Sequence, residues 1–211
     1  MSSRLNLYNN ALLILGERSL SALTDSVASR RQLDQVWNSE GVRKCLEQGQ
    51  WRFATRSVQL DYDPDIDPPF GARRAFSKPT DWVTTVGVCT DEYFREPLIQ
   101  YREEGGYLYA DLDTLYVRYV SNDENFGLNI NEWPGWFEEF VAAHFASQLA
   151  LQLSEDKLKT ATAIREKRKR EALNRDAMSD PTKFPPTGSW NRARQRNFGR
   201  GDRGTRTGDL Y

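Results

Sequence analysis

The spacing of apolar residues changes twice along this chain, from helical to strand-like and back again. Near the N-terminus apolar residues recur at helical spacing, at Leu5, Tyr8, Leu12 and Leu15. Between about residues 51 and 121 the chain carries short stretches rich in Val, Tyr and Thr, separated by turn residues. Helical spacing returns after Pro134. This order predicts an α+β fold, in which a small antiparallel sheet domain is inserted into a four-helix bundle.

The N-terminal part contains two of the predicted helices. The first covers residues 5–15 and stops at Gly16, a residue type that favours helix C-termini. The second begins at Asp25 or Ser26, either of which suits an N-cap, and runs to about Gln48. Gly41 lies inside this second helix and weakens the prediction that it is continuous.

The other two helices follow the strands. One begins at Pro134, a residue type that suits a helix start, and the last runs from Ser154 or Glu155 to about Ala177. The middle of the last helix, residues 165–171, contains no apolar residue. Because a helix with a thin apolar seam is only marginally stable alone, we expect it to pack on the preceding helix or on a neighbouring subunit.

The central segment is expected to form the sheet. Strand-like stretches occur at residues 51–60, 82–88, 98–101, 107–109 and 115–120. Gly105 and Gly106 make a two-residue turn of the kind that joins hairpin strands. The chain thus divides into N-terminal helices (1–50), an inserted sheet domain (51–121), C-terminal helices (122–180) and a tail (181–211).

The tail combines turn residues, arginines and aromatic residues without a periodic apolar face. We expect it to be extended, and to act either as a docking segment or as a loose end. Aromatic anchors and charged side chains favour the docking interpretation. The predicted partner-binding residues are Phe184, Trp190, Arg192, Arg194, Arg196, Phe198, Arg200 and Tyr211.

Charge is distributed unevenly although the net charge of the chain is only -1. Beyond Pro186 six Arg face two Asp, which gives +4, so the rest of the chain carries about -5. A basic tail on an acidic body indicates an interaction with an acidic surface, a phosphate chain or a neighbouring copy. Aromatic residues make up 12% of the chain. They predict either a large interfacial surface or a small aromatic core.

The sequence contains little that points to catalysis. The one histidine, His144, falls on the apolar stripe of a predicted helix and is expected to serve in packing. Cys45 and Cys89 lie in unrelated segments, which argues against a disulfide framework and a zinc site. Phosphate-binding glycine motifs do not occur. We therefore expect no enzyme, no catalytic residue and no cofactor.

Alternating aspartates from Asp61 to Asp67 superficially resemble a calcium loop. Ile66 and Ala72 stand where that loop requires Gly and Glu, so we expect a solvated acidic loop and no metal site. No N-terminal signal and no apolar run long enough to span a bilayer occur in this sequence. A soluble protein made in the cytoplasm, with no membrane partner, is expected.

Several segments, in order and at suitable spacing over about residues 5–180, resemble one family. They are Ala11-Leu-Leu-Ile-Leu-Gly-Glu17, Leu23-Thr-Asp25, Trp51-Arg-Phe-Ala54 before Gln59-Leu60, Lys78-Pro-Thr-Asp-Trp82, Trp136-Phe-Glu-Glu-Phe-Val-Ala-Ala143, and the Ala- and Leu-rich stretch 146–153. Together they resemble the head-to-tail adaptor (connector) proteins of tailed bacteriophages, called tail tubular protein A in short-tailed phages. The Arg-Gly-aromatic tail departs from the family's general pattern.

The resemblance implies a structural subunit of the virion, made in the host cytoplasm. Twelve copies would form a ring at the head–tail junction, between the portal protein and the next tail component. Genome DNA would pass through the ring without specific binding, and the tail would bind the portal. An alternative remains open, in which the chain binds nucleic acid through its Arg/Gly-rich tail.

Overall fold

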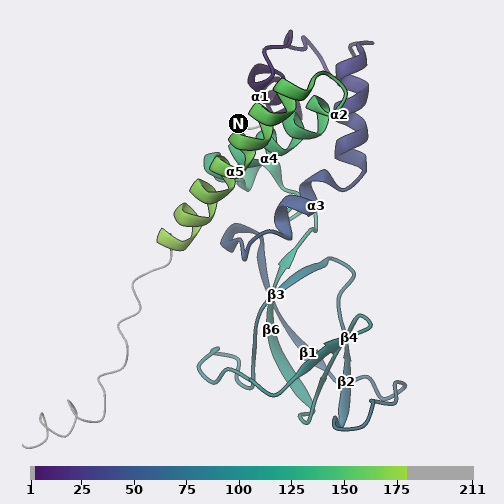
Figure 1. Ribbon diagram of the computed structural model, residues 1–211. Coiled ribbons are helices and arrows are strands. Elements are labelled where there is room, and N and C mark those ends of the chain that lie inside the picture. The colour runs from purple at the N-terminus through teal and green to yellow at the C-terminus, as the bar shows by residue number, and fades with distance from the viewer. Residues whose placement is uncertain (1–2, 180–211) are drawn as a thin grey trace, which may run out of the picture. The chain divides into compact units, whose positions relative to one another are not determined.

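The computed structural model describes residues 3–179 (Figure 1). This part has an α+β fold with five α-helices and two three-stranded antiparallel sheets. The sheets lie between the N-terminal and C-terminal helices in the chain, which is the predicted order of elements. The residues up to Ala177 form one compact unit, which is described below.

The first helix has the predicted position. α1 (Arg4–Ile14) begins after Ser3, whose side chain accepts a hydrogen bond from the Asn6 amide at 3.2 Å. Gly16 follows its end with a φ of +67°, in the left-handed region that glycine adopts without strain.

The predicted second helix is in fact two helices, so the prediction of one helix to Gln48 was wrong. α2 (Ala28–Asn38) and α3 (Gly41–Leu46) are separated at Glu40, whose φ is +61°. A Cβ on Gly41 would lie 2.6 Å from the Val36 carbonyl oxygen and 3.0 Å from the Phe145 ring. The chain therefore turns sharply here because glycine allows close approach to both groups.

The start of α2 also differs from the prediction. The N-cap position is Val27, which makes no side-chain hydrogen bond to the helix. Asp25 instead accepts hydrogen bonds from the amides of Ser21 and Ala22, at 2.8 and 3.1 Å, inside the preceding loop. A good capping residue is thus used for a local turn and does not start the helix.

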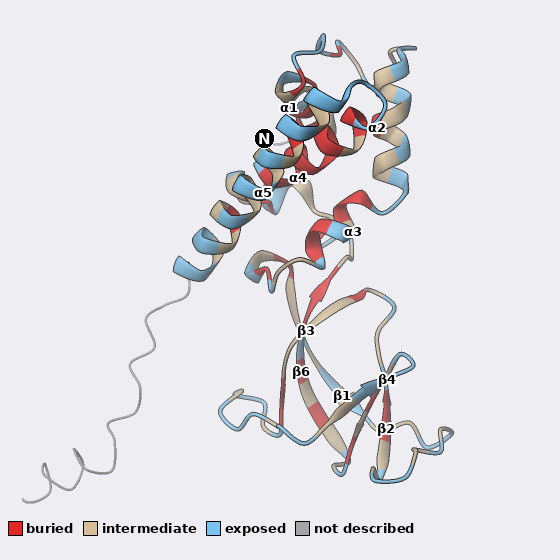
Figure 2. Ribbon diagram, in the orientation of Figure 1, coloured by how far each residue is buried: buried red, intermediate tan, exposed pale blue. Residues whose placement is uncertain are grey.

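The C-terminal helices differ strongly in burial (Figure 2). α4 (Gly135–Ala150) begins directly after Pro134, as predicted, and most of its residues are buried against α1, α2 and α3. α5 (Glu155–Met178) also has its predicted bounds, but only Ala161 and Ala172 are buried in it. Its thin apolar seam leaves most of the helix surface exposed.

The sheet region has six strands. They are β1 (Thr55–Asp61), β2 (Arg74–Ser77), β3 (Trp82–Cys89), β4 (Arg102–Glu104), β5 (Tyr107–Ala110) and β6 (Thr114–Ser121). One sheet has the order β1-β6-β3 and the other β2-β5-β4, where a single sheet was expected. A short 3-10 helix, η1 (Arg52–Ala54), precedes β1, and another, η2 (Ile130–Glu132), precedes α4.

Two strand predictions need correction. The stretch at residues 98–101 is not a strand; β4 starts at Arg102, after an isolated bridge between Cys89 and Pro97. β2 was not predicted, because four residues between a Pro-rich loop and Lys78 are too few to show a period. The hairpin turn at Gly105 and Gly106 is confirmed, and both residues have positive φ values, of 57° and 87°.

The helices and the sheet region each have a hydrophobic core. In the helical core the Trp51 ring lies 5.0 Å from the Phe137 ring, and its indole N–H donates to the Cys45 carbonyl at 3.0 Å. Trp133 is buried there too and donates to the Gly127 carbonyl at 2.9 Å. Tryptophan is thus used largely in the core, which favours the aromatic-core alternative for these residues.

One carboxylate joins three strand ends of the β1-β6-β3 sheet. Asp81, just before β3, accepts hydrogen bonds from Ser121 and from the Tyr119 hydroxyl, at 3.1 Å, and pairs with Arg56 at 3.0 Å. Burial alone would raise the pKa of Asp81, but these hydrogen bonds outweigh burial and lower it. The neighbouring Trp82 ring stacks on Tyr119 with 4.3 Å between the ring centroids.

Candidate functional site

The residues predicted to bind a partner lie outside the described part of the chain. They are Phe184, Trp190, Arg192, Arg194, Arg196, Phe198, Arg200 and Tyr211. The candidate sites that follow therefore come from the surface of residues 3–179.

Exposed apolar side chains in the sheet region mark the first candidate, termed here the sheet tip. Phe70 is 94% exposed and Ile99 is 86% exposed. Each directly precedes a segment that lines one cavity of about 200 Å³, residues 71–72 and residues 100–102. Arg102 donates to the Phe70 carbonyl at 2.7 Å and so connects the two segments. Two large apolar side chains thus stand on a connected surface without a partner in the folded subunit.

The aspartate-rich loop before Phe70 is held by its own side chains. Asp63 accepts hydrogen bonds from the Asp65 amide at 3.1 Å and from the Ser77 hydroxyl at 2.9 Å. Asp111 accepts from the Arg73 amide at 2.9 Å. The contact of Asp63 with the Asp65 amide is that of a turn. The contacts with Ser77 and between Asp111 and Arg73 join segments that are further apart in the chain.

A second exposed loop in the sheet region carries Tyr93. The Asp91 carboxylate accepts hydrogen bonds from the Arg95 and Glu96 amides at 2.9 to 3.1 Å, and these bonds lower its pKa. Phe94 has a φ of +55°, which is unfavourable for a bulky side chain, and its ring lies 3.9 Å from the Arg118 guanidinium carbon. The loop is therefore ordered by contacts that leave the Tyr93 ring exposed.

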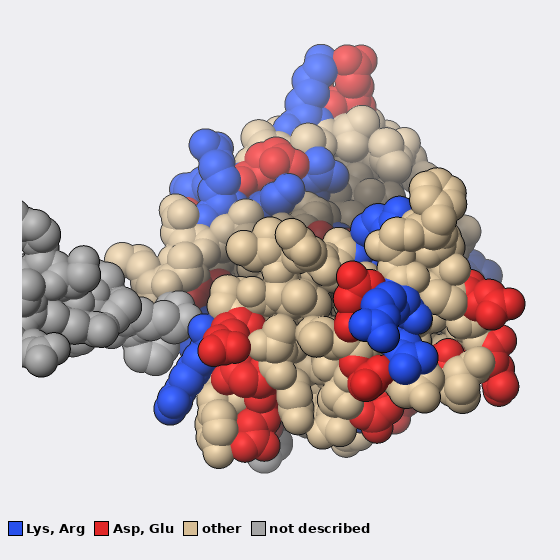
Figure 3. Space-filling view, turned by 90° about the horizontal axis from the view of Figure 1, so that it is seen from below, with Lys and Arg blue, Asp and Glu red and all other residues tan. Residues whose placement is uncertain are grey.

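The sheet region is acidic. Residues 55–121 contain 12 Asp and Glu against 7 Lys and Arg, a difference of -5. Figure 3, seen from below the view of Figure 1, shows acidic side chains on both sides of a broad uncharged area, with basic side chains beside them at several places. The sheet region as a whole is thus suited to a basic partner, and the sheet tip adds apolar side chains to it.

The second candidate is a groove between α1, α4 and α5, with a volume of about 390 Å³. Its apolar lining includes Leu13, which is 76% exposed although it lies in α1. Charged residues also line it: Arg168 pairs with Glu139 at 2.8 Å, and Lys167 lies beside it on α5. The lining residues are Asn10, Leu13, Ile14, Glu139, Ala142, Ile164, Lys167 and Arg168.

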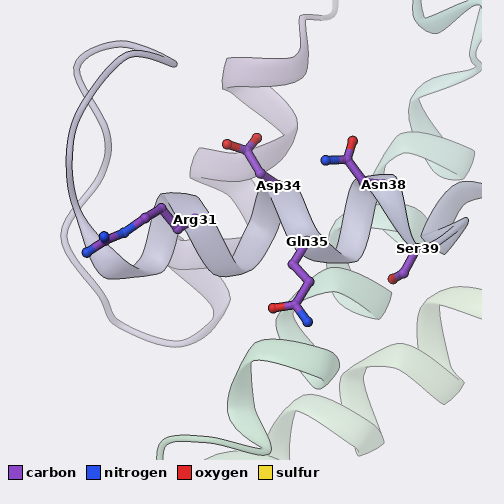
Figure 4. Close-up of a pocket in the computed structure, with 5 residues that line it drawn as sticks. All are labelled: Arg31, Asp34, Gln35, Asn38 and Ser39. Atoms are coloured by element: carbon purple, nitrogen blue, oxygen red, sulfur yellow. The ribbon is translucent and has the colours of Figure 1, made fainter.

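A depression along α2 has more polar lining but no arrangement for catalysis. Figure 4 shows its residues, Arg31, Asp34, Gln35, Asn38 and Ser39, all on one helix or its end and pointing in different directions. The Asp34 carboxylate is already bonded to Arg4 and Arg30, at 2.7 Å each, and to the Tyr8 hydroxyl at 2.9 Å. It acts as a link between α1 and α2.

His144 lies inside the helical core, as its place on the apolar stripe predicted. It is 5% exposed, and neither ring nitrogen has a hydrogen-bond partner. Burial, together with the positive charges of Arg165 and Lys44, lowers its pKa to about 4. The imidazole is therefore neutral at physiological pH.

Residues 3–179 contain no cluster of three or more His, Cys, Asp or Glu side chains placed to hold a metal ion. Within the same residues, no helix is long and apolar enough to cross a membrane. The sequence matches no protein-family model, and none of the curated proteins compared with it is significantly similar.

Neither surface was singled out from the sequence. Leu13 lies one position from the stripe formed by Leu12 and Leu15, and that offset is the signal that places it outside the core. Phe70 follows two prolines in an acidic loop, where a large aromatic residue is unusual.

Proposed function

We propose that this protein is a head-to-tail adaptor of a bacteriophage virion, a structural subunit that docks on the portal as a ring, with twelve copies expected. The ring links the portal to the next tail component and continues the DNA channel. The proposal starts from the ordered segments that resemble the adaptor family.

The observation that carries the proposal is that the described surface offers several exposed apolar side chains suited to binding other proteins, and few groups arranged for catalysis. The described residues present exposed apolar side chains both on the helices, at Leu13 and Leu151, and on the sheet region, at Phe70 and Ile99. A ring subunit needs separate surfaces for its neighbours and for the components above and below it. An inserted sheet between helices, with the helices acting as a four-helix bundle, is the architecture that the resemblance implies.

The surfaces suggest how such a subunit is used. The tail, residues 181–211, would engage the portal through its arginine and aromatic residues. The acidic sheet region, with the apolar sheet tip, would meet a basic surface of the next tail component. Genome DNA would pass through the lumen, and the excess of acidic groups would keep phosphates from binding tightly.

The test is to mix the purified protein with the portal protein encoded by the same genome and to image the mixture by electron microscopy. We expect a ring added to one end of the portal, with its symmetry visible directly. Folded protein and intact portal without added density would overturn the proposal. Salt-sensitive binding to DNA or RNA that is lost with residues 181–211 would then support the nucleic-acid alternative.

A further inference from the structure

The α1–α4–α5 groove has apolar side chains in its lining that stay exposed to solvent in the subunit. Leu13 and Ile14 from α1 meet Ile164 from α5 around it, and Leu13 remains 76% exposed. Exposure of an apolar groove to water is unfavourable, and its burial by a partner is favourable. The groove therefore calls for an occupant with apolar side chains.

The turn between α4 and α5 has the matching chemistry. Every residue from 151 to 156 is exposed, including Leu151 at 62% and Leu153 at 43%. Glu155 and Asp156 follow in the first turn of α5 and make this segment acidic. The 151–156 turn therefore presents two leucines beside two carboxylates.

Charge on α5 changes sign along the helix in a way that fits this turn. Residues 165–171 contain five basic residues against Glu166 and Glu171, a difference of 5 − 2 = +3. Lys167 and Arg168 line the groove together with Glu139, so two of its three charged lining residues are basic. An acidic, leucine-bearing turn and an apolar groove with a basic border are complementary in both respects.

We propose that the 151–156 turn of one copy docks in the α1–α4–α5 groove of the next copy, with Leu151 and Leu153 as the apolar anchors. The inference deepens the proposed function and rests on it, since it names the two faces through which ring neighbours meet.

The contact joins two copies because the two surfaces are well separated within one. Ile164 and Arg168 lie 9 and 13 positions beyond Glu155, the first residue of α5, which corresponds to about 14 to 20 Å along its axis. A rigid helix cannot bring its own first turn into a groove beside its middle. Turn and groove are also different patches, so the contact is head-to-tail and generates a ring when the rotation closes.

Two substitutions at exposed positions test the two faces separately. Leu13→Glu places a charge in the groove, and Leu151→Glu removes an anchor from the turn. Val27→Glu is the matched control, because Val27 is an exposed apolar residue, at 49%, that belongs to neither the groove nor the turn. Circular dichroism of each full-length variant shows whether its fold is retained.

Sedimentation velocity over a concentration series is the measurement. We expect the unmodified protein and Val27→Glu to self-associate, and each of the other variants to associate about tenfold or more weakly. A mixture of Leu13→Glu and Leu151→Glu should form pairs and nothing larger, because one variant keeps an intact turn and the other an intact groove.

Three results would overturn the inference: an unmodified protein that is monomeric at every concentration, variants that assemble like the unmodified protein, or a mixture that forms particles larger than a pair. Its failure is distinguishable from failure of the adaptor proposal. If both variants still formed rings on the portal, the inferred interface would be refuted and the adaptor proposal would be retained. If the protein self-associated through the groove but did not bind the portal, the adaptor proposal would be refuted and the interface would be retained.

Discussion

At the residue scale, Asp81 shows how one side chain can organise a sheet. It lies in the Lys78-Pro-Thr-Asp-Trp82 segment and connects the start of β3 to β1 through Arg56 and to β6 through Tyr119 and Ser121. The carboxylate also affects its partner Tyr119, because burial and the nearby negative charge of Asp81 raise the pKa of Tyr119 to about 12.

Asp81→Asn is expected to lower the free energy of unfolding by about 1 to 3 kcal/mol, since a charged acceptor of several hydrogen bonds is lost in a partly buried place. Urea unfolding at neutral pH is the measurement, with Asp67→Asn in the exposed loop as the control. Equal losses in the two variants would contradict the role assigned to Asp81.

His144 predicts a pH dependence of stability. Its pKa of about 4 in the folded protein lies below the ordinary value of 6.5. Between these two values the unfolded chain binds a proton that the folded protein does not, so stability falls as the pH falls from about 6.5 towards 4. The difference corresponds to about 3 kcal/mol over the whole range.

The measurement is urea unfolding of the unmodified protein and of His144→Leu at several pH values between 7 and 4. The variant should lose stability less steeply in this range, because it cannot take up the proton. Carboxylates titrate in both proteins and cancel in the comparison. Parallel pH profiles for the two proteins would show that the buried imidazole does not contribute.

At the scale of elements, the break between α2 and α3 is the clearest case of packing overriding local pattern. Gly41→Ala would place a methyl group against the Val36 carbonyl and Phe145, at 2.6 and 3.0 Å. We expect a loss of about 2 to 4 kcal/mol, since a backbone group on one side and a core ring on the other must move.

Gly87→Ala is the matched control for that substitution, because nothing lies within 4 Å of a Cβ at Gly87. Thermal unfolding of both variants checks the prediction. A Gly41 variant as stable as the Gly87 variant would mean that the α2–α3 corner adjusts without cost.

α5 has few buried residues for its length. Its buried residues are Ala161 and Ala172, and its further links to the rest of the subunit include the Lys157–Glu17 and Arg168–Glu139 ion pairs and the hydrogen bond from the Arg52 amide to Asp176. Exposed ion pairs contribute little to stability. A helix held in this way gains most from an added contact, which is the role that the inferred subunit interface gives it.

At the scale of the whole molecule, the tail (residues 181–211) and residues 3–179 are expected to serve different functions. Both hydrophobic cores lie within residues 3–179. Deletion of residues 181–211 should therefore leave the unfolding temperature nearly unchanged and abolish portal attachment. Calorimetry and electron microscopy with the portal check the two parts, and normal attachment of the truncated protein would refute a docking tail.

The sequence by itself determined the order and kind of the main elements. Helical spacing gave α1, α4 and α5 nearly their observed ends, and paired glycines identified the β4–β5 turn. These features depend on periodicity and on backbone preference, which act between residues close in the chain. His144 was also placed correctly, because its stripe is part of the same local pattern.

Only the tertiary structure decided which surfaces are left uncovered. The groove is assembled from residues 10–14, 139–142 and 164–168, and the sheet tip from residues 70–72 and 99–102. No local period relates segments so far apart in the chain, and whether Leu13 is covered depends on what packs beside it. The same holds for the α2–α3 corner, where contact with Phe145 on a distant helix outweighs the preference of the local sequence to continue the helix.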